Sequence, residues 1–167
     1  MTMIIDGSAG VTFPNSTVQA SAGQVLQVVN ATYSTQTTNA STSVYANTGL
    51  TASITPKFST SKILVLINHN GNVNIGNSST GAIKFKLQKN GSDISFIDGM
   101  SSYNGNSANN SGGATTSIVY QDSPATTSST TYSTQFAARN VGTAYIQYND
   151  GAGLQSVSTI TLMEIAA

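Results

Sequence analysis

The sequence predicts an all-β fold: a β-sandwich or jelly-roll-like knob of roughly eight to ten short antiparallel strands, preceded by a short extended segment. The first observation is compositional, because 63 of the 167 residues are Ser, Thr or Asn, which favour strands and turns. Strong helix formers are few, with one Glu, five Lys and one Arg in the chain. The third observation is a series of short apolar runs separated by turn signals, with no fixed repeat.

The N-terminal segment, residues 1–23, differs from the rest and is predicted to be a docking segment ahead of a β-sandwich domain at residues 24–167. Its apolar runs and its turn signal follow one another closely: Ile4-Ile5, then Asp6-Gly7, then Val11 to Phe13, ended by Pro14. About twenty residues cannot bury a core alone. We therefore expect this segment to pair with a partner or with the main domain, or to stay mobile.

The main domain opens with a candidate strand from Val25 to Thr37. Both of its faces are apolar near the start, so we expect that end to be buried on both sides. Two short candidates follow at residues 44–45 and 50–54. The most hydrophobic run, Lys62 to Asn68, is bounded by polar turn formers and predicts a central strand.

The clearest hairpin signal is Asn90-Gly91. Residues 82–89 before it alternate between apolar and polar side chains, and apolar residues resume at 94–97. Asn-Gly between two such runs predicts a two-residue turn, because a type I′ turn needs positive φ at both positions.

An extended polar loop is predicted at residues 99–113, and loops of this length in a compact domain are commonly functional or mobile. Tyr103 is the single aromatic residue in it. A ring among Ser, Asn and Gly is typical of adaptable binding surfaces, so Tyr103 is a candidate receptor contact; the alternative is that it anchors its own loop. Further strands are predicted at 115–120, 130–138, 141–148 and 156–165.

The last of these strands is apolar on both faces. Ile160 and Leu162 fall on one face, and Val157, Met163 and Ile165 fall on the other. The second face is a candidate contact with a neighbouring subunit. The alternative is a central strand that is buried within a single sandwich.

Residues able to do chemistry are sparse, so the sequence predicts no enzyme, no cofactor and no metal site. Cysteine is absent, and the one histidine, His69, is expected at a strand end in a surface or loop-packing role. The acids are scattered in turns, where Asp commonly bonds its own backbone. Lys84 and Lys86 share one face of the hairpin, where solvated charges discourage edge pairing; the alternative is an anion-binding patch.

The charge and the apolar runs of the chain argue against nucleic acid and membranes as partners. Formal net charge is zero and only 7% of residues are charged, so a basic footprint for nucleic acid is missing. The longest apolar run, Ile63 to Ile67, is too short to cross a bilayer, and no signal peptide is visible. Because low net charge gives weak colloidal protection, the protein is easier to understand as part of an assembly.

Two parts of the chain resemble bacteriophage proteins. Residues 6–20, DGSAGVTFPNSTVQA, resemble the "DG…G-(I/V/L)-TFPDGT-x-Q" segment near the start of many phage tail-fibre and virion-appendage proteins, with Asn15-Ser16 in place of the usual Asp-Gly. A recurrent module of phage and aquatic viral structural proteins is similar to four further stretches: residues 23–29, 35–36, 122–124 and 158–165.

The resemblance implies a virion appendage, such as a head fibre, a short tail fibre or a capsid decoration protein, that forms a homotrimer. It implies that the N-terminal segment attaches to capsid or tail proteins through six residues: Ile4, Ile5, Asp6, Val11, Phe13 and Pro14. The distal loops would face outward for host adhesion, and the protein would be made in the host cytoplasm and reside in the virion. The alternative function is a lectin-like domain that binds carbohydrate or a receptor, with host surface glycans as partners.

Overall fold

The computed structural model describes residues 4–6, 10–12, 18–19, 23–74, 80–103, 111–149, 151 and 155–167. These residues form strands, turns and bends, without a helix. Within the same residues no helix is therefore long and apolar enough to span a membrane. The predicted all-β class is confirmed.

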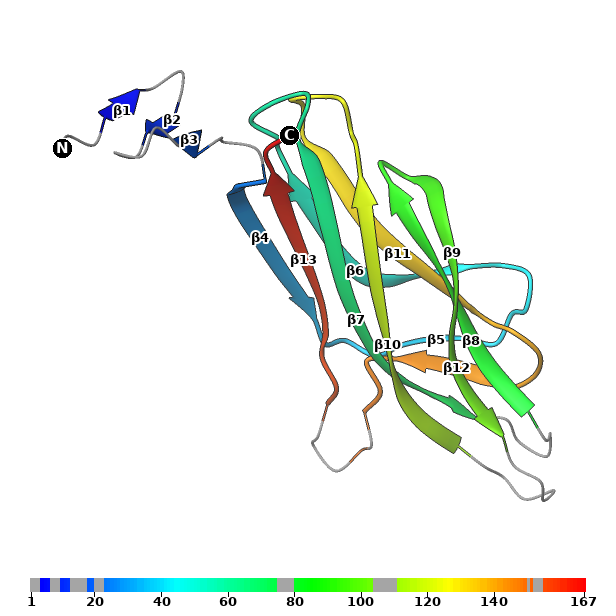
Figure 1. Ribbon diagram of the computed structural model, residues 1–167. Helices are drawn as coiled ribbons and strands as arrows, with labels where there is room; N and C mark the ends of the chain where they lie inside the picture. Colours follow the sequence, from blue (N-terminus) through cyan, green and yellow to red (C-terminus); the bar gives the residue numbers. More distant parts are fainter. Residues whose placement is uncertain are drawn as a thin grey trace.

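Eight long strands form the body of the molecule: β4 (Val25–Tyr33), β6 (Ala46–Ile54), β7 (Lys62–Asn74), β8 (Thr80–Lys89), β9 (Ser92–Tyr103), β10 (Ser111–Asp122), β11 (Thr130–Ala138) and β13 (Ser158–Ile165). They pair antiparallel into two sheets, in the orders β4-β13-β7-β10 and β6-β11-β8-β9 (Figure 1). Among these eight, the chain changes sheet at every step except the β8–β9 hairpin. This is the arrangement of a jelly roll, so the predicted sandwich is confirmed.

Two short strands extend the first sheet. β12 (Thr143–Ile146) pairs with the second half of β7, where β13 no longer accompanies that strand, and β5 (Thr37–Asn39) pairs with β12. β7 is therefore flanked along its length, by β10 on one edge and by β13 and then β12 on the other. The central strand predicted at Lys62 to Asn68 is confirmed and is longer than predicted.

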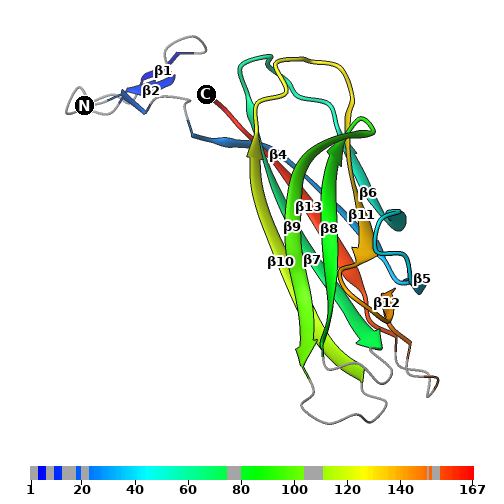
Figure 2. The same ribbon diagram turned by 90° about the vertical axis from the view of Figure 1, so that its right-hand side faces the viewer.

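The strands place their connections at two ends of the sandwich (Figures 1 and 2). The chain enters the sandwich at Gly23, and the C-terminus, the β8–β9 turn and the connections at 55–61 and 123–129 lie at this entry end. Backbone hydrogen bonds from Gly23 to Ala166 and from Ala166 to Gln24, 2.7 and 2.8 Å long, fix the point of entry. β7, β9 and β12 reach the opposite end, the far end.

The N-terminal segment forms a small sheet of its own. β1 (Ile4–Asp6), β2 (Gly10–Thr12) and β3 (Val18–Gln19) pair antiparallel in that order, outside the sandwich (Figure 1). The sequence predicts pairing with a partner, pairing with the main domain, or mobility. In the structure the described residues of the segment pair with one another, which satisfies their backbone hydrogen bonds, and pairing with a partner stays a prediction.

The core lies between the two sheets and follows from the alternation of buried and outward side chains along much of each strand. Every second residue of β8, namely Ile83, Phe85 and Leu87, is fully buried, whereas the lysines between them face outward. The hairpin prediction is confirmed, because Asn90 and Gly91 have φ of 49° and 81° and join β8 to β9.

Three expectations are wrong. The start of β4 is not buried on both sides, because β4 is an edge strand and leaves Val25 49% and Val28 56% exposed. The loop predicted at 99–113 is too long at both ends, since β9 continues to Tyr103 and β10 begins at Ser111, and residues 104–110 lie outside the described residues. His69 is not at a strand end: it lies within β7 and is fully buried.

Candidate functional site

The outer face of the β4-β13-β7-β10 sheet is the most distinctive surface of the described molecule. Along β13 the buried side chains are Ser158, Ile160, Leu162 and Glu164, so the alternate residues face outward. Cross-strand pairing then sets apolar side chains beside one another. Met163 lies between Val28 and Leu64, and Leu66 pairs with Val119.

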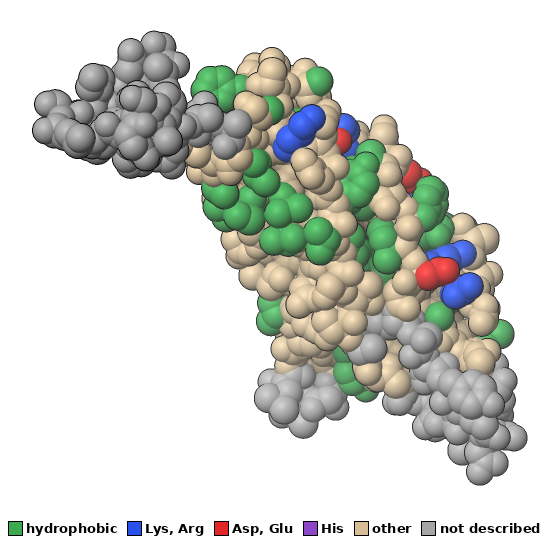
Figure 3. Space-filling model, in the orientation of Figure 1, with side chains coloured by type: hydrophobic (Ala, Val, Ile, Leu, Met, Phe, Trp, Pro, Cys, Tyr) green, Lys and Arg blue, Asp and Glu red, His purple; other side chains and the backbone are tan. Residues whose placement is uncertain are grey.

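We call this surface the outer apolar patch, made of Val25, Val28, Leu64, Leu66, Val119, Met163 and Ile165. Val119 is 70% exposed, which is unusual for a large aliphatic side chain within a strand. In Figure 3 hydrophobic side chains form a continuous area over β4, β13 and β7, and charged side chains lie only at its margin. Contiguous exposed apolar areas on soluble proteins mark interaction sites.

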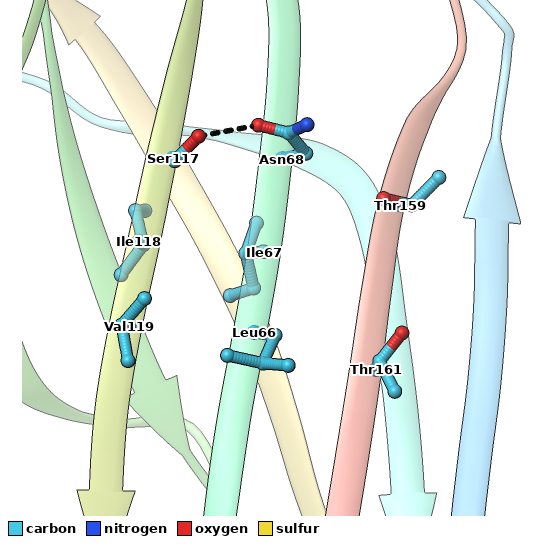
Figure 4. A pocket seen from close by; sticks show the side chains of 8 residues that line it. All are labelled: Leu66, Ile67, Asn68, Ser117, Ile118, Val119, Thr159 and Thr161. Carbon is cyan, nitrogen blue, oxygen red and sulfur yellow. Dashed lines mark hydrogen bonds between the residues drawn. The ribbon is translucent and has the colours of Figure 1, made fainter.

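A shallow depression of about 280 Å³ continues the patch between β10, β7 and β13. Leu66, Val119, Thr159 and Thr161 surround it, and Figure 4 shows Ser117 bonded to Asn68 at one side, through a 2.7 Å hydrogen bond. The depression has hydroxyl and methyl groups on its walls and no charged group. Its chemistry suits a neutral protein surface better than an ionic ligand.

The entry end of the sandwich is held by buried charges. Glu164 is fully buried and accepts hydrogen bonds from Gln27 Nε2 at 2.5 Å and from the backbone N–H of Lys57 at 2.7 Å. Burial raises the pKa of Glu164, but these hydrogen bonds outweigh it and the pKa lies below its ordinary value. Glu164 therefore ties the 55–61 connection to β13 and β4.

A second buried carboxylate fixes the β10–β11 connection. Asp122 accepts a 2.7 Å hydrogen bond from the Tyr132 hydroxyl and forms a 2.9 Å ion pair with Lys89. Burial raises the pKa of Asp122, while the bonds from Lys89 and Tyr132 lower it more, so the carboxylate stays charged. Together with Glu164 this gives the entry end a rigid frame.

The structure brings together some of the predicted contact residues and separates others. Met163 and Ile165 lie in the outer apolar patch and are half-buried there, whereas β13 is a central strand between β4 and β7, as the alternative expects; a contact of this face with a neighbouring subunit stays a prediction. Val157 is 42% exposed but precedes β13, with Thr159 and Thr161 between it and Met163. Tyr103 ends β9 at the far end, paired with Thr80, and is a strand residue instead of a loop residue.

The predicted attachment residues are divided by the described ranges. Ile4, Ile5 and Asp6 form β1, and Val11 lies opposite Ile5 in β2. Phe13 and Pro14 lie outside the described residues.

Sequence reasoning missed Val28, Leu64, Leu66 and Val119 as surface residues. In the run KILVLIN, apolar residues occupy both the odd-numbered and the even-numbered positions. This pattern is equally typical of a strand that is buried on both faces. A signal was nevertheless present, because Met163 and Ile165 belong to a strand with the same two-faced pattern. Two adjacent strands of this kind require an additional cover for one face of their sheet.

His69 contacts an aromatic ring and a hydroxyl group inside the sandwich. Its ring stacks on Phe85 with centroids 4.9 Å apart, and Nε2 lies 3.0 Å from the Thr134 hydroxyl. Desolvation lowers its pKa to about 4. Among the described residues no group of three His, Cys, Asp or Glu side chains is placed to hold a metal ion.

Comparisons with known proteins give no family. No protein-family model and no curated protein matches the chain. Among solved structures, the VP2 protein of infectious bursal disease virus in derived T=1 particles matches at 12% identity and a TM-score of 0.38, over 98% of this chain and 44% of that one. The Gx strain of the same virus matches at 14% identity and a TM-score of 0.37, over 90% and 40% of the two chains.

A different kind of protein matches at a similar level. Dimeric latent PorU from Porphyromonas gingivalis has 11% identity and a TM-score of 0.32, over 89% of this chain and 14% of that one. The chain therefore spans less than half the length of each of these structures. Likenesses of this size are distant, and no function follows from them.

Proposed function

We propose that this protein is a structural protein of a bacteriophage virion, a fibre or decoration protein that assembles as a homotrimer and has no catalytic activity. The observation that carries the proposal is the outer apolar patch, which an isolated chain would leave in water. The resemblance of residues 6–20 to the start of phage appendage proteins supports the virion location.

A second copy of this chain is the occupant that suits the patch best. The patch holds no charged side chain, and Lys62 at its edge is engaged with Ser123 through a 2.8 Å hydrogen bond. The chain has zero formal net charge, so copies approach without long-range repulsion. Depletion of charge at the centre is a property that distinguishes protein interfaces from other surfaces.

The two ends of the sandwich support a division of roles. The N-terminal strands and the rigid entry end lie together, so this end would attach to capsid or tail proteins through the segment that holds Ile4 to Val11. The far end, where β9 ends at Tyr103, would project outward and be available for host adhesion. The buried state of His69 supports the absence of catalysis.

The test measures the mass of the purified protein by light scattering across a range of concentrations. The native chain is expected at three times its 17.2 kDa, and Val119→Lys is expected to shift it towards the monomer. Val44→Lys is the matched control, because Val44 is 68% exposed and lies before β6, away from the patch. A native chain that stays monomeric at high concentration would refute the assembly, and equal effects of both variants would refute its location.

A further inference from the structure

We propose that the outer face of the other sheet, β6-β11-β8-β9, carries a binding site for a neutral carbohydrate, built on Tyr45 and Phe96 with charged side chains between and beside the two rings. The site uses a different layer of the sandwich from the outer apolar patch. Assembly through the patch would therefore leave the carbohydrate site open. The inference depends on the proposed virion role only for its biological meaning.

Strand pairing brings the site together. Lys86 on β8 lies opposite Phe96 on β9, and Lys84 lies opposite Asp98. Because the buried residues of β8 are Ile83, Phe85 and Leu87, these lysines face outward.

Tyr45 arrives from the connection between β5 and β6, which reaches across the sheet towards β8 (Figure 1). Lys84 Nζ donates a 2.8 Å hydrogen bond to the Thr42 carbonyl of this connection. The backbone N–H of Ala138 donates to the Ser41 carbonyl at 3.0 Å. The connection is therefore fixed, and Tyr45 is held over the lysines.

The two rings lie on either side of one ammonium group. Lys86 Nζ is 4.3 Å from the centroid of Tyr45 and 5.1 Å from the centroid of Phe96, and it forms a 2.6 Å ion pair with Asp93. Phe96 is nevertheless 68% exposed, so most of its surface remains open to a ligand. Since Lys86 already occupies the space between the rings, a ligand cation has no place there.

This place holds a large share of the few charged residues in the chain. Of six basic and six acidic residues in the sequence, five lie here: Lys84, Lys86, Asp93, Asp98 and Arg139. Arg139 lies 3.4 Å from Asp98, and both side chains are more than half exposed. The remaining outward residues of this sheet are mostly Ser, Thr, Asn and Gln, so the cluster is a local exception.

The balance of these charges argues for a neutral ligand that has both donors and acceptors. Three cations and two carboxylates leave an excess of one positive charge, and Lys86 is already paired with Asp93. A phosphate or sulfate would meet the Asp98 carboxylate as well as the lysines. Sugar hydroxyls can donate to Asp98 and accept from Lys84, and the C–H face of a sugar can stack on an exposed ring.

The shape of the surface fits one terminal sugar residue. A depression of about 210 Å³ is lined by Tyr45, Lys84, Phe96 and Asp98, and the buried Phe85 closes its floor. It is open to solvent, which suits the end of a glycan chain better than an enclosed small molecule.

The test begins with the full chain on an array of neutral oligosaccharides of hexoses and N-acetylhexosamines, with sulfated and sialylated counterparts beside them. Calorimetry then measures the affinity for the neutral oligosaccharide that binds best. Phe96→Ala and Tyr45→Ala are each expected to weaken binding about tenfold or more, because each removes a stacking ring. Phe58→Ala is the control, since Phe58 is 56% exposed in the 55–61 connection, and it is expected to change the affinity less than about twofold.

Several outcomes would overturn the proposal: no binding of any neutral oligosaccharide, binding of the acidic ones alone, or full affinity in Phe96→Ala. Loss of binding in Tyr103→Ala with full affinity in Phe96→Ala would move the site to the far end. Light scattering on Phe96→Ala is expected to give the native mass. A failure of glycan binding is therefore distinguishable from a failure of assembly.

Discussion

Acidification is predicted to weaken this protein through one buried side chain, His69. The ring is fully buried against Phe85, and its Nδ1 makes no hydrogen bond to any residue that the structure describes. Desolvation lowers the pKa from 6.5 to about 4. His69 is therefore protonated near pH 6.5 in the unfolded chain, but only near pH 4 in the folded chain.

The sign and size of the effect follow from linkage. Between pH 6.5 and about 4 the unfolded state binds more protons than the folded state, so the free energy of unfolding falls as the pH falls. A difference of about 2.5 between the two pKa values corresponds to about 3 kcal/mol at pH 4, of which about 2 kcal/mol is already lost at pH 5. Below pH 4 this contribution levels off.

Urea unfolding of the native chain and of His69→Gln, at one protein concentration and at pH 7.5, 5 and 4, measures the effect. The glutamine variant removes the titrating ring, so the difference between the two pH profiles isolates it from carboxylates shared by both proteins. The carboxylates with lowered pKa, such as Asp122 and Glu164, begin to lose their contribution only near the acid end of the His69 window, as the pH falls through their ordinary pKa values, and they do so equally in both proteins. Parallel profiles for the two proteins would refute the reasoning, as would an NMR titration of this single histidine with a midpoint near 6.5.

Two further predictions concern packing and hydrogen bonding. Gly49→Ala is expected to destabilise the fold by about 1–3 kcal/mol more than Gly91→Ala, measured by urea unfolding: both residues have positive φ, but a Cβ at Gly49 would collide with the ring of Tyr33, whereas Gly91 has open space. Tyr132→Phe is expected to cost about 1–3 kcal/mol, because the buried carboxylate of Asp122 loses its 2.7 Å hydrogen bond; a change under about 0.5 kcal/mol would contradict this.

The sequence predicts the parts of the fold that depend on neighbours in the chain. The hairpin at Asn90-Gly91 follows from its own turn chemistry, and the alternation of 82–89 fixes which side chains enter the core. The loop from 99 to 113 was overestimated because its Gly and Ser residues carry turn propensity. Long ladders with β8 and β7 override that propensity at both ends.

Contacts between distant parts of the chain could not be predicted in this way. His69 is buried because Phe85 and Thr134, on two other strands, contact it inside the sandwich. The sequence around His69 does not indicate these contacts. The outer apolar patch has the same origin. Leu66 and Val119 are neighbours because β7 and β10 pair, although 53 positions separate them in the sequence. Similarly, the sequence does not show that Lys86 contacts both Tyr45 and Phe96, because this contact depends on how the strands and the connection fold together.

The few charges of this chain are distributed so that its two outer sheet faces differ. One set of charged side chains lies at the entry end: Lys57, Lys62, Lys89, Asp122 and Glu164. Another set, on the outer face of β6-β11-β8-β9, forms the proposed carbohydrate site. The outer face of β4-β13-β7-β10 keeps only Lys62, at its margin. An uncharged apolar face loses little on desolvation, whereas a charged aromatic face would lose its hydration if it were covered. Burying the uncharged face in an assembly therefore costs less desolvation free energy. The charged face then remains in solvent, where it can bind a polar ligand.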